Sequence, residues 1–201
     1  MRALGMDPVR DARETFRALV DATSRPGTVR RVPVAPADRA VLATLVDHEV
    51  TCFTPDADVR EALAGEGRLA DAPFEAARVV HAPESTDGRV RDANRGTRKE
   101  PSVGATVIYR VDAVRTVDDE NRGSGRDARD APPIRSADST RVTVTGPGVP
   151  DERTLAVGGL PRAELRAVAD AQSDYPRGVD VVFAAGDRVA ALPRSVSLEV
   201  A

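Results

Sequence analysis

Helical and strand-like patterns alternate along the first half of the chain, and this alternation limits the fold more than any other feature of the sequence. A helix is predicted to begin near Asp7, which can cap it, with Pro8 in its first turn. The next predicted elements are a strand at 28–33, a helix that Asp38 can cap, a strand at 50–53, a brief helix at 59–63 and a strand at 76–81. The first helix has an apolar face formed by Val9, Ala12, Phe16, Leu19 and Val20.

The second half of the chain is richer in strands. Strands are predicted at 105–111 and 142–144, and a helix that Pro161 opens precedes a near-continuous apolar strand at 179–183. A turn at 186–187 leads into two more strands, at 188–192 and 196–200. Residues 118–140 are too polar and too rich in helix and strand breakers to bury anything, so we expect a disordered loop there. The order of elements predicts one three-layer α/β domain over residues 1–201, with a mixed sheet.

Charge and composition exclude several classes of protein. The 29 basic residues are outnumbered by 32 acidic ones and only 3% of the residues are aromatic, so nucleic-acid binding is disfavoured. No apolar run is long enough to span a membrane, and the first residues lack a signal-peptide pattern, so we expect a cytoplasmic protein with no membrane contact. One cysteine and two histidines make a structural metal site improbable. The abundance of Ala, Arg and Asp is typical of a GC-rich genome in a salty cytoplasm, a halophilic composition.

The few nucleophilic or basic side chains lack a catalytic setting. Cys52 and His48 share no glycine elbow, so Cys52 is interpreted as a small buried residue of a strand. His81 precedes Ala82-Pro83 and is interpreted as an ordinary strand-end residue rather than a base. Lys99, the only lysine, lies in a polar charged stretch that would neither lower its pKa nor place it after a glycine-rich turn, which argues against P-loop and pyridoxal-phosphate catalysis.

Asp180 stands inside an otherwise apolar strand, where an unpaired carboxylate would be costly. Arg194, beside the next strand, is the candidate partner. Two interpretations remain open: an internal Asp-Arg clamp, or an arginine that contacts a phosphate or phosphonate.

Five short motifs, in the same order along nearly the whole chain, resemble the PhnH family, the H subunit of the bacterial and archaeal carbon-phosphorus lyase system. They are Phe16-Arg17-Ala18-Leu19 through Ser24-Arg25-Pro26-Gly27; Leu45-Val46-Asp47; Gly96-Thr97 with Pro101 and Gly104-Ala105-Thr106; Thr145-Gly146-Pro147-Gly148; and Tyr175-Pro176-Arg177-Gly178-Val179-Asp180 with Ala191-Leu192-Pro193-Arg194. The polar stretch at 118–140 is longer than the family pattern and is interpreted as an insertion.

The resemblance implies a fold similar to the large domain of type I PLP-dependent transferases, without that cofactor. It also implies a homodimer inside a core assembly with the G, I and J subunits. That assembly uses MgATP as a substrate and replaces the adenine of ATP by a phosphonate, giving a ribose 1-phosphonate 5-triphosphate. This chain is then an accessory or scaffolding subunit that binds no cofactor or metal itself.

No catalytic residue is assigned from the sequence. The candidates for binding a ligand or an anion are Asp180, Arg194, Gly178 and Arg17, and the sequence leaves open whether Arg17 is a surface charge or an interface contact. The alternatives are a stand-alone small-molecule enzyme that uses Asp180 and Arg194, or a homodimer that binds phosphorylated ligands.

Overall fold

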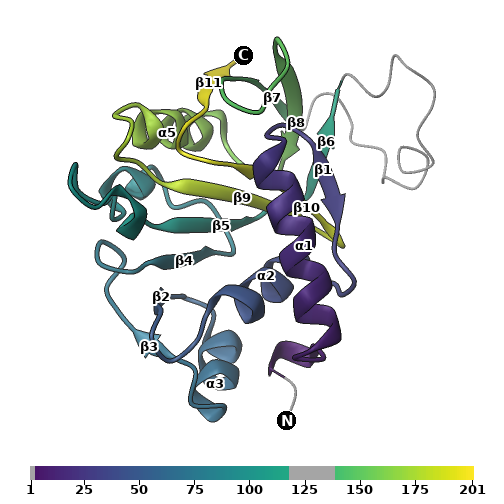
Figure 1. Ribbon diagram of the computed structural model, residues 1–201, viewed down its shortest axis with the longest axis vertical. Coiled ribbons are helices and arrows are strands. Elements are labelled where there is room, and N and C mark those ends of the chain that lie inside the picture. The colour runs from purple at the N-terminus through teal and green to yellow at the C-terminus, as the bar shows by residue number, and fades with distance from the viewer. Residues whose placement is uncertain (1–2, 118–138) are drawn as a thin grey trace.

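The protein folds around two sheets (Figure 1). The computed structural model describes residues 3–117 and 139–201. The helices are α1 (Arg10–Ser24), α2 (Ala37–Leu45), α3 (Ala57–Gly65) and α5 (Arg162–Gln172), with 3-10 turns η1 (Ala3–Gly5), η2 (Arg89–Asp92) and η3 (Pro101–Val103).

The larger sheet is mixed, as the order of elements predicts. Its seven strands lie in the order β1 (Val29–Arg31), β10 (Arg188–Leu192), β9 (Asp180–Ala185), β5 (Thr106–Arg110), β4 (Val79–Ala82), β2 (Thr51–Phe53) and β3 (Ala70–Asp71). The strands from β9 to β3 are parallel to one another, whereas β10 is antiparallel to both β9 and β1. The hairpin of β9 and β10 therefore joins the parallel part of the sheet to its edge.

A second, antiparallel sheet is the main feature that the sequence did not predict. Its strands lie in the order β11 (Ser197–Val200), β7 (Ser139–Thr145), β8 (Arg153–Gly158) and β6 (Ala113–Thr116). Neither β6 nor β8 was predicted. Residues 139–140 belong to β7 and not to the expected loop, because they pair with Gly158 and Val157, while 118–138 lie outside the described residues.

Two apolar cores cover the two faces of the larger sheet. On one face α1, α2 and α3 pack around side chains such as Leu42, Val59 and Ile108. On the other face α5 and the second sheet pack around Tyr109, Leu155 and Phe183. The layers are thus helices, a mixed sheet, and a helix with a second sheet. No helix among the described residues has the length and apolar character needed to cross a bilayer.

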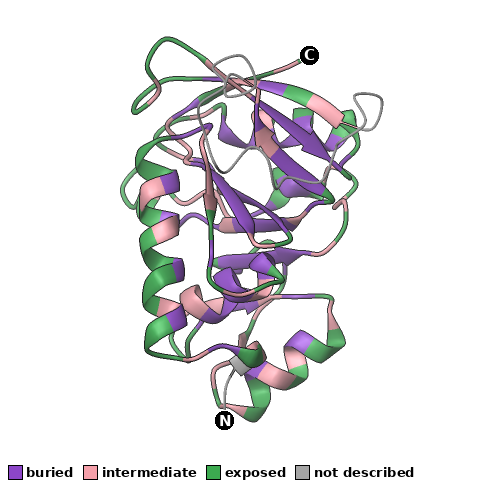
Figure 2. Cartoon of the chain, turned by 90° about the vertical axis from the view of Figure 1, so that its right-hand side faces the viewer, coloured by how far each residue is buried: buried purple, intermediate pink, exposed green. Residues whose placement is uncertain are grey.

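Helix α1 is rotated about its axis relative to the orientation that its apolar residues predict. Leu19 and Ala22 are buried together with the polar Asp11 and Thr15, whereas Val9, Phe16 and Val20 are 76%, 54% and 48% exposed. Figure 2 shows exposed residues along the outer side of α1 and buried residues on the side facing the sheets. The packing of α1 on α2, β1 and β10 decides this orientation, and it leaves an apolar stripe at the surface.

Candidate functional site

Asp180 and Arg194 form the predicted clamp where β9 begins and β10 ends. The two strands are antiparallel, with Leu192 opposite Val181, so the residues flanking that pair are neighbours. The Arg194 backbone N–H donates to Asp180 Oδ1 at 2.8 Å and its Nε donates to the same atom at 3.1 Å, while Nη2 donates to Oδ2. This forked pairing is the geometry in which arginine binds a carboxylate most strongly.

The rest of the Arg194 guanidinium is held by backbone carbonyls. Nη1 donates to the carbonyl of Pro101, and Nη2 lies 3.4 Å from the carbonyl of Gly104. Gly178 permits this approach, because its φ of 154° suits glycine and a Cβ there would lie 3.2 Å from Cβ of Arg194. The clamp therefore connects the loop before β5 to the start of β9 and to the residues that follow β10. Arg194 would have to break these internal hydrogen bonds to bind an external anion.

A groove of about 300 Å³ runs beside the clamp, between α1 and the sheet. Asp180 lines it at one end, and its other walls are mostly apolar: Phe16, Leu19, Val20, Leu45, Val181, Val182, Ala191, Leu192 and Pro193, with Thr23, Ser24 and Thr106. Arg17 is exposed on α1 and does not line the groove. The structure thus brings Asp180, Arg194 and Gly178 together and leaves Arg17 apart from them.

A second polar centre, which the sequence analysis missed, is buried near the carboxyl ends of the parallel strands. His81 on β4 lies with Nε2 3.0 Å from Asp38 Oδ2 and with Nδ1 2.8 Å from the hydroxyl of Thr54, which follows β2. Arg110, the last residue of β5, donates from Nε to the same Asp38 oxygen at 2.8 Å. Because an ionised carboxylate only accepts hydrogen bonds, Nε2 of His81 donates to Asp38, while Nδ1 and the hydroxyl of Thr54 share the other hydrogen bond.

The roles of Asp38 and His81 differ from those predicted. Pro36 occupies the N-cap position of α2, so Asp38 is in the first turn of that helix and points into the core, 1% exposed. His81 is 1% exposed and is a partner of two buried groups rather than an ordinary strand-end residue. Burial alone would raise the pKa of Asp38, but the hydrogen bonds from His81 and Arg110 outweigh it and lower the pKa to about 2.

Glu164, on α5, is another carboxylate that is almost fully buried. It accepts hydrogen bonds from the hydroxyls of Ser85 at 3.1 Å, Thr86 at 2.5 Å and Tyr109 at 2.5 Å, and from the backbone N–H of Gly88 at 2.7 Å. Burial would raise the pKa of Glu164, but these four donors lower it. The centre joins α5 to the loop before η2 and to β5.

These two centres stabilise the fold and lack access for a substrate. The hydroxyl, imidazole and carboxylate of the first centre are linked in the order found in a catalytic triad of nucleophile, base and acid: Thr54, His81 and Asp38. Each of these residues is at most 1% exposed, so a substrate has no path to the hydroxyl of Thr54.

Cys52 is buried in β2, as predicted, and burial raises its pKa to about 12. His48 is exposed and lies beside Glu49. Within the described ranges, no group of three His, Cys, Asp or Glu side chains is placed to hold a metal ion.

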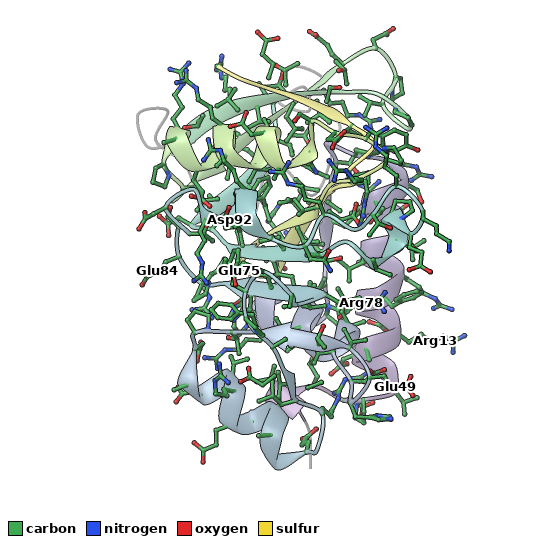
Figure 3. All side chains as sticks on the ribbon, turned by 90° about the vertical axis from the view of Figure 1, so that its left-hand side faces the viewer. Arg13, Glu49, Glu75, Arg78, Glu84 and Asp92 are labelled. Atoms are coloured by element: carbon green, nitrogen blue, oxygen red, sulfur yellow. The ribbon has the colours of Figure 1, made fainter. Side chains whose placement is uncertain are left out.

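Charged residues of both signs cover much of the remaining surface. Figure 3 shows this on one side of the molecule, where the labelled side chains are acidic (Glu75, Glu84, Asp92 and Glu49) and basic (Arg78 and Arg13). Lys99 lies among such exposed residues, in the loop between η2 and η3. A surface of this kind indicates no single charged site on that side.

Comparisons with known proteins agree with the order of the sequence motifs. The family model described as "Bacterial phosphonate metabolism protein (PhnH)" matches residues 5–199. A relative from Stutzerimonas stutzeri, "Putative C-P lyase subunit protein HtxG", is 31% identical over 92% of this chain and 84% of its own length. Another, from Rhizobium meliloti (strain 1021), is "Alpha-D-ribose 1-methylphosphonate 5-triphosphate synthase subunit PhnH", which is 26% identical over 96% of this chain and 92% of its own length.

Proposed function

The chain belongs to the PhnH family of bacterial phosphonate metabolism proteins, and from this premise we propose that it is a subunit of the carbon-phosphorus lyase core assembly. In that role it supports the transfer of a phosphonate to the ribose of ATP with release of adenine, giving a ribose 1-phosphonate 5-triphosphate. The observation that carries the proposal is the match over residues 5–199, together with two relatives whose names describe subunits.

The role we propose is accessory or scaffolding. Arg194 is held by Asp180 and two carbonyls, and the Thr54, His81 and Asp38 centre is sealed, so neither offers a reacting group to MgATP or to a phosphonate. The proposal includes kinship with the large domain of type I PLP-dependent transferases, without the cofactor. The exposed loop position of Lys99, the only lysine, supports this, because a Schiff-base lysine is enclosed with its cofactor.

The exposed stripe of α1 is the surface that we assign to a partner subunit. Val9, Phe16 and Val20 lie within one narrow sector of the helix, and Arg13 and Arg17 flank that sector at helical spacing. Figure 3 shows Arg13 projecting outward from the helix. Large apolar side chains in a row, with charges along one side, are typical of a protein interface.

The charges favour a different subunit over a second copy as the occupant of this stripe. A twofold contact centred on α1 would bring the basic flank of one copy close to that of the other. A subunit that presents apolar side chains flanked by carboxylates fits the stripe without that repulsion. We propose that one of the G, I and J subunits binds here, and that the homodimer expected from the family uses another face.

Co-expression with the other core subunits of the same genome tests the proposal. Size exclusion and mass spectrometry should show that the wild-type chain elutes with them, and that Phe16→Asp, at an already exposed position, abolishes co-elution without unfolding the chain. Tyr175→Asp is the matched control, because Tyr175 is 67% exposed and lies in the loop between α5 and β9 rather than on α1. Elution as a lone dimer that consumes ATP or binds phosphonate would contradict the proposal and support a stand-alone enzyme.

A further inference from the structure

An arginine-lined pocket of about 330 Å³ opens on the second sheet, and none of its lining residues belongs to the clamp or to the stripe of α1. It is lined by Arg115 of β6, Ala156 of β8, Ser139, Thr140 and Arg141 of β7, Arg162 of α5, and Ala201. Its volume is at the lower end of the range for pockets that hold small molecules, roughly 300–1,000 Å³.

Strand register forms the floor of this pocket. Ala156 is paired with Arg115 on one side and with Arg141 on the other, so the three side chains share one face of the sheet. The neighbouring pair of Leu155 and Val142 belongs to the apolar core on the opposite face. Because neighbouring strands are about 4.8 Å apart, the two arginines begin roughly 10 Å from each other across a small alanine.

Arg162 adds a third guanidinium from the edge of the sheet. It is the first residue of α5, and its Nη2 lies 3.5 Å from the carbonyl of Val200 on β11. The hydroxyl of Ser139, on the same face of β7 as Arg141, supplies a further group that can hydrogen-bond to an oxygen-rich ligand.

Two of the three arginines that line this pocket, Arg141 and Arg162, differ from many other surface arginines because they have no carboxylate partner among the described residues. Elsewhere, arginines pair with neighbouring carboxylates, as in Arg30 with Asp21, Arg60 with Asp71, Arg89 with Glu75, Arg91 with Asp170, and Arg177 with Asp174. Among the residues that the structure describes, no Asp or Glu side chain lines the pocket, and neither Arg141 nor Arg162 pairs with a carboxylate. The guanidinium groups of Arg141 and Arg162 are therefore available to an anion from solution.

We propose that this pocket binds a small anion with several phosphoryl groups, such as an organic or inorganic triphosphate. Guanidinium groups match phosphoryl oxygens in forked pairs, and arginines on separate walls favour an anion with several charged groups over a single phosphate. The inference rests on the pocket alone and requires neither the other subunits nor any reaction by this chain.

Calorimetric titration of the full chain with inorganic tripolyphosphate tests the site. We expect one saturable site per chain, with affinity lowered on the order of tenfold or more in Arg141→Gln and in Arg162→Gln. Arg78→Gln, which removes one exposed arginine that lines neither the pocket nor the stripe of α1, is the matched control and should bind as the wild type does. Circular dichroism of each variant checks that the fold is intact, and Arg141→Lys should recover only part of the affinity, because lysine keeps the charge and loses the fork.

Three results would overturn the inference. The first is a heat of binding that does not saturate as tripolyphosphate is added. The second is an equal loss of affinity in Arg78→Gln and Arg141→Gln, which would indicate general charge attraction. The third is binding of orthophosphate as tight as that of tripolyphosphate, which would contradict recognition of several phosphoryl groups.

Discussion

Replacing Asp38 with asparagine should remove a buried charge that the fold depends on. The carboxylate is 1% exposed and accepts from His81 Nε2 at 3.0 Å and from Arg110 Nε at 2.8 Å. An asparagine has one acceptor oxygen and no charge, so Arg110 loses its shortest ion pair and retains only Asp56 at 3.5 Å.

The size of the effect follows from the pKa of Asp38. Folding lowers it from 3.8 to about 2, and a difference of almost two pKa units corresponds to about 2 kcal/mol of stability for the ionised carboxylate. Breaking a buried ion pair costs about 3–5 kcal/mol in other proteins, so we expect Asp38→Asn to lower the free energy of unfolding by about 2–4 kcal/mol at neutral pH. A lowered pKa stabilises the fold fully above 3.8, and that contribution is lost as the pH falls through about 2.

Urea unfolding followed by far-UV circular dichroism measures this difference, because the chain has no tryptophan for fluorescence. The difference in the free energy of unfolding between wild type and Asp38→Asn should become smaller as the pH is lowered from neutral to about 2.5. Asp151→Asn is the control, because Asp151 is exposed in a turn with φ of 55° that asparagine tolerates, and it should change stability by less than about 0.5 kcal/mol. A difference between wild type and Asp38→Asn below about 1 kcal/mol at neutral pH, or a difference that is the same at both pH values, would refute the reasoning.

Three further predictions concern other buried groups. Tyr109→Phe removes one of four donors to Glu164, so it should raise the pKa of that carboxyl and lower the free energy of unfolding by about 1.5–3 kcal/mol at neutral pH, as urea titration would show. Arg194→Lys keeps the charge but loses the fork to Asp180, so it should lower stability by about 1–3 kcal/mol; an unchanged melting temperature would contradict the clamp. The thiol of Cys52 should resist a thiol reagent in the native state and react only after unfolding, because burial raises its pKa to about 12; rapid labelling of the native protein would contradict this.

The clamp was predictable because its evidence is local. A carboxylate in an apolar strand requires a partner, and the hairpin of β9 and β10 brings Arg194 back beside Asp180 only 14 residues later. The buried centre of Thr54, His81 and Asp38 lacked such a signal. Its members come from separate elements, and only the parallel pairing of β2 with β4 and the packing of α2 on the sheet place them together.

Helix α1 shows the limit of apolar spacing in the same way. The sequence placed an amphipathic helix correctly, and Asp7 accepts hydrogen bonds from the N–H groups of Val9 and Arg10 as a capping residue does. The sequence could not decide the orientation of that helix, because Phe16 and Leu19 are both large and apolar, yet only Leu19 is buried. Packing against α2 and β10 made that choice.

The sequence by itself therefore determined the alternation of helices and strands, the mixed sheet, the Asp180 and Arg194 pair, and the motifs of the family. These depend on local spacing and on residues that nearby turns bring together. Only the tertiary structure decided the second sheet, the sealed His81 centre, the exposed stripe of α1 and the arginine pocket. Each of these arises from the pairing of strands or the rotation of a helix, and such contacts between residues distant in the chain leave no periodic pattern in the sequence.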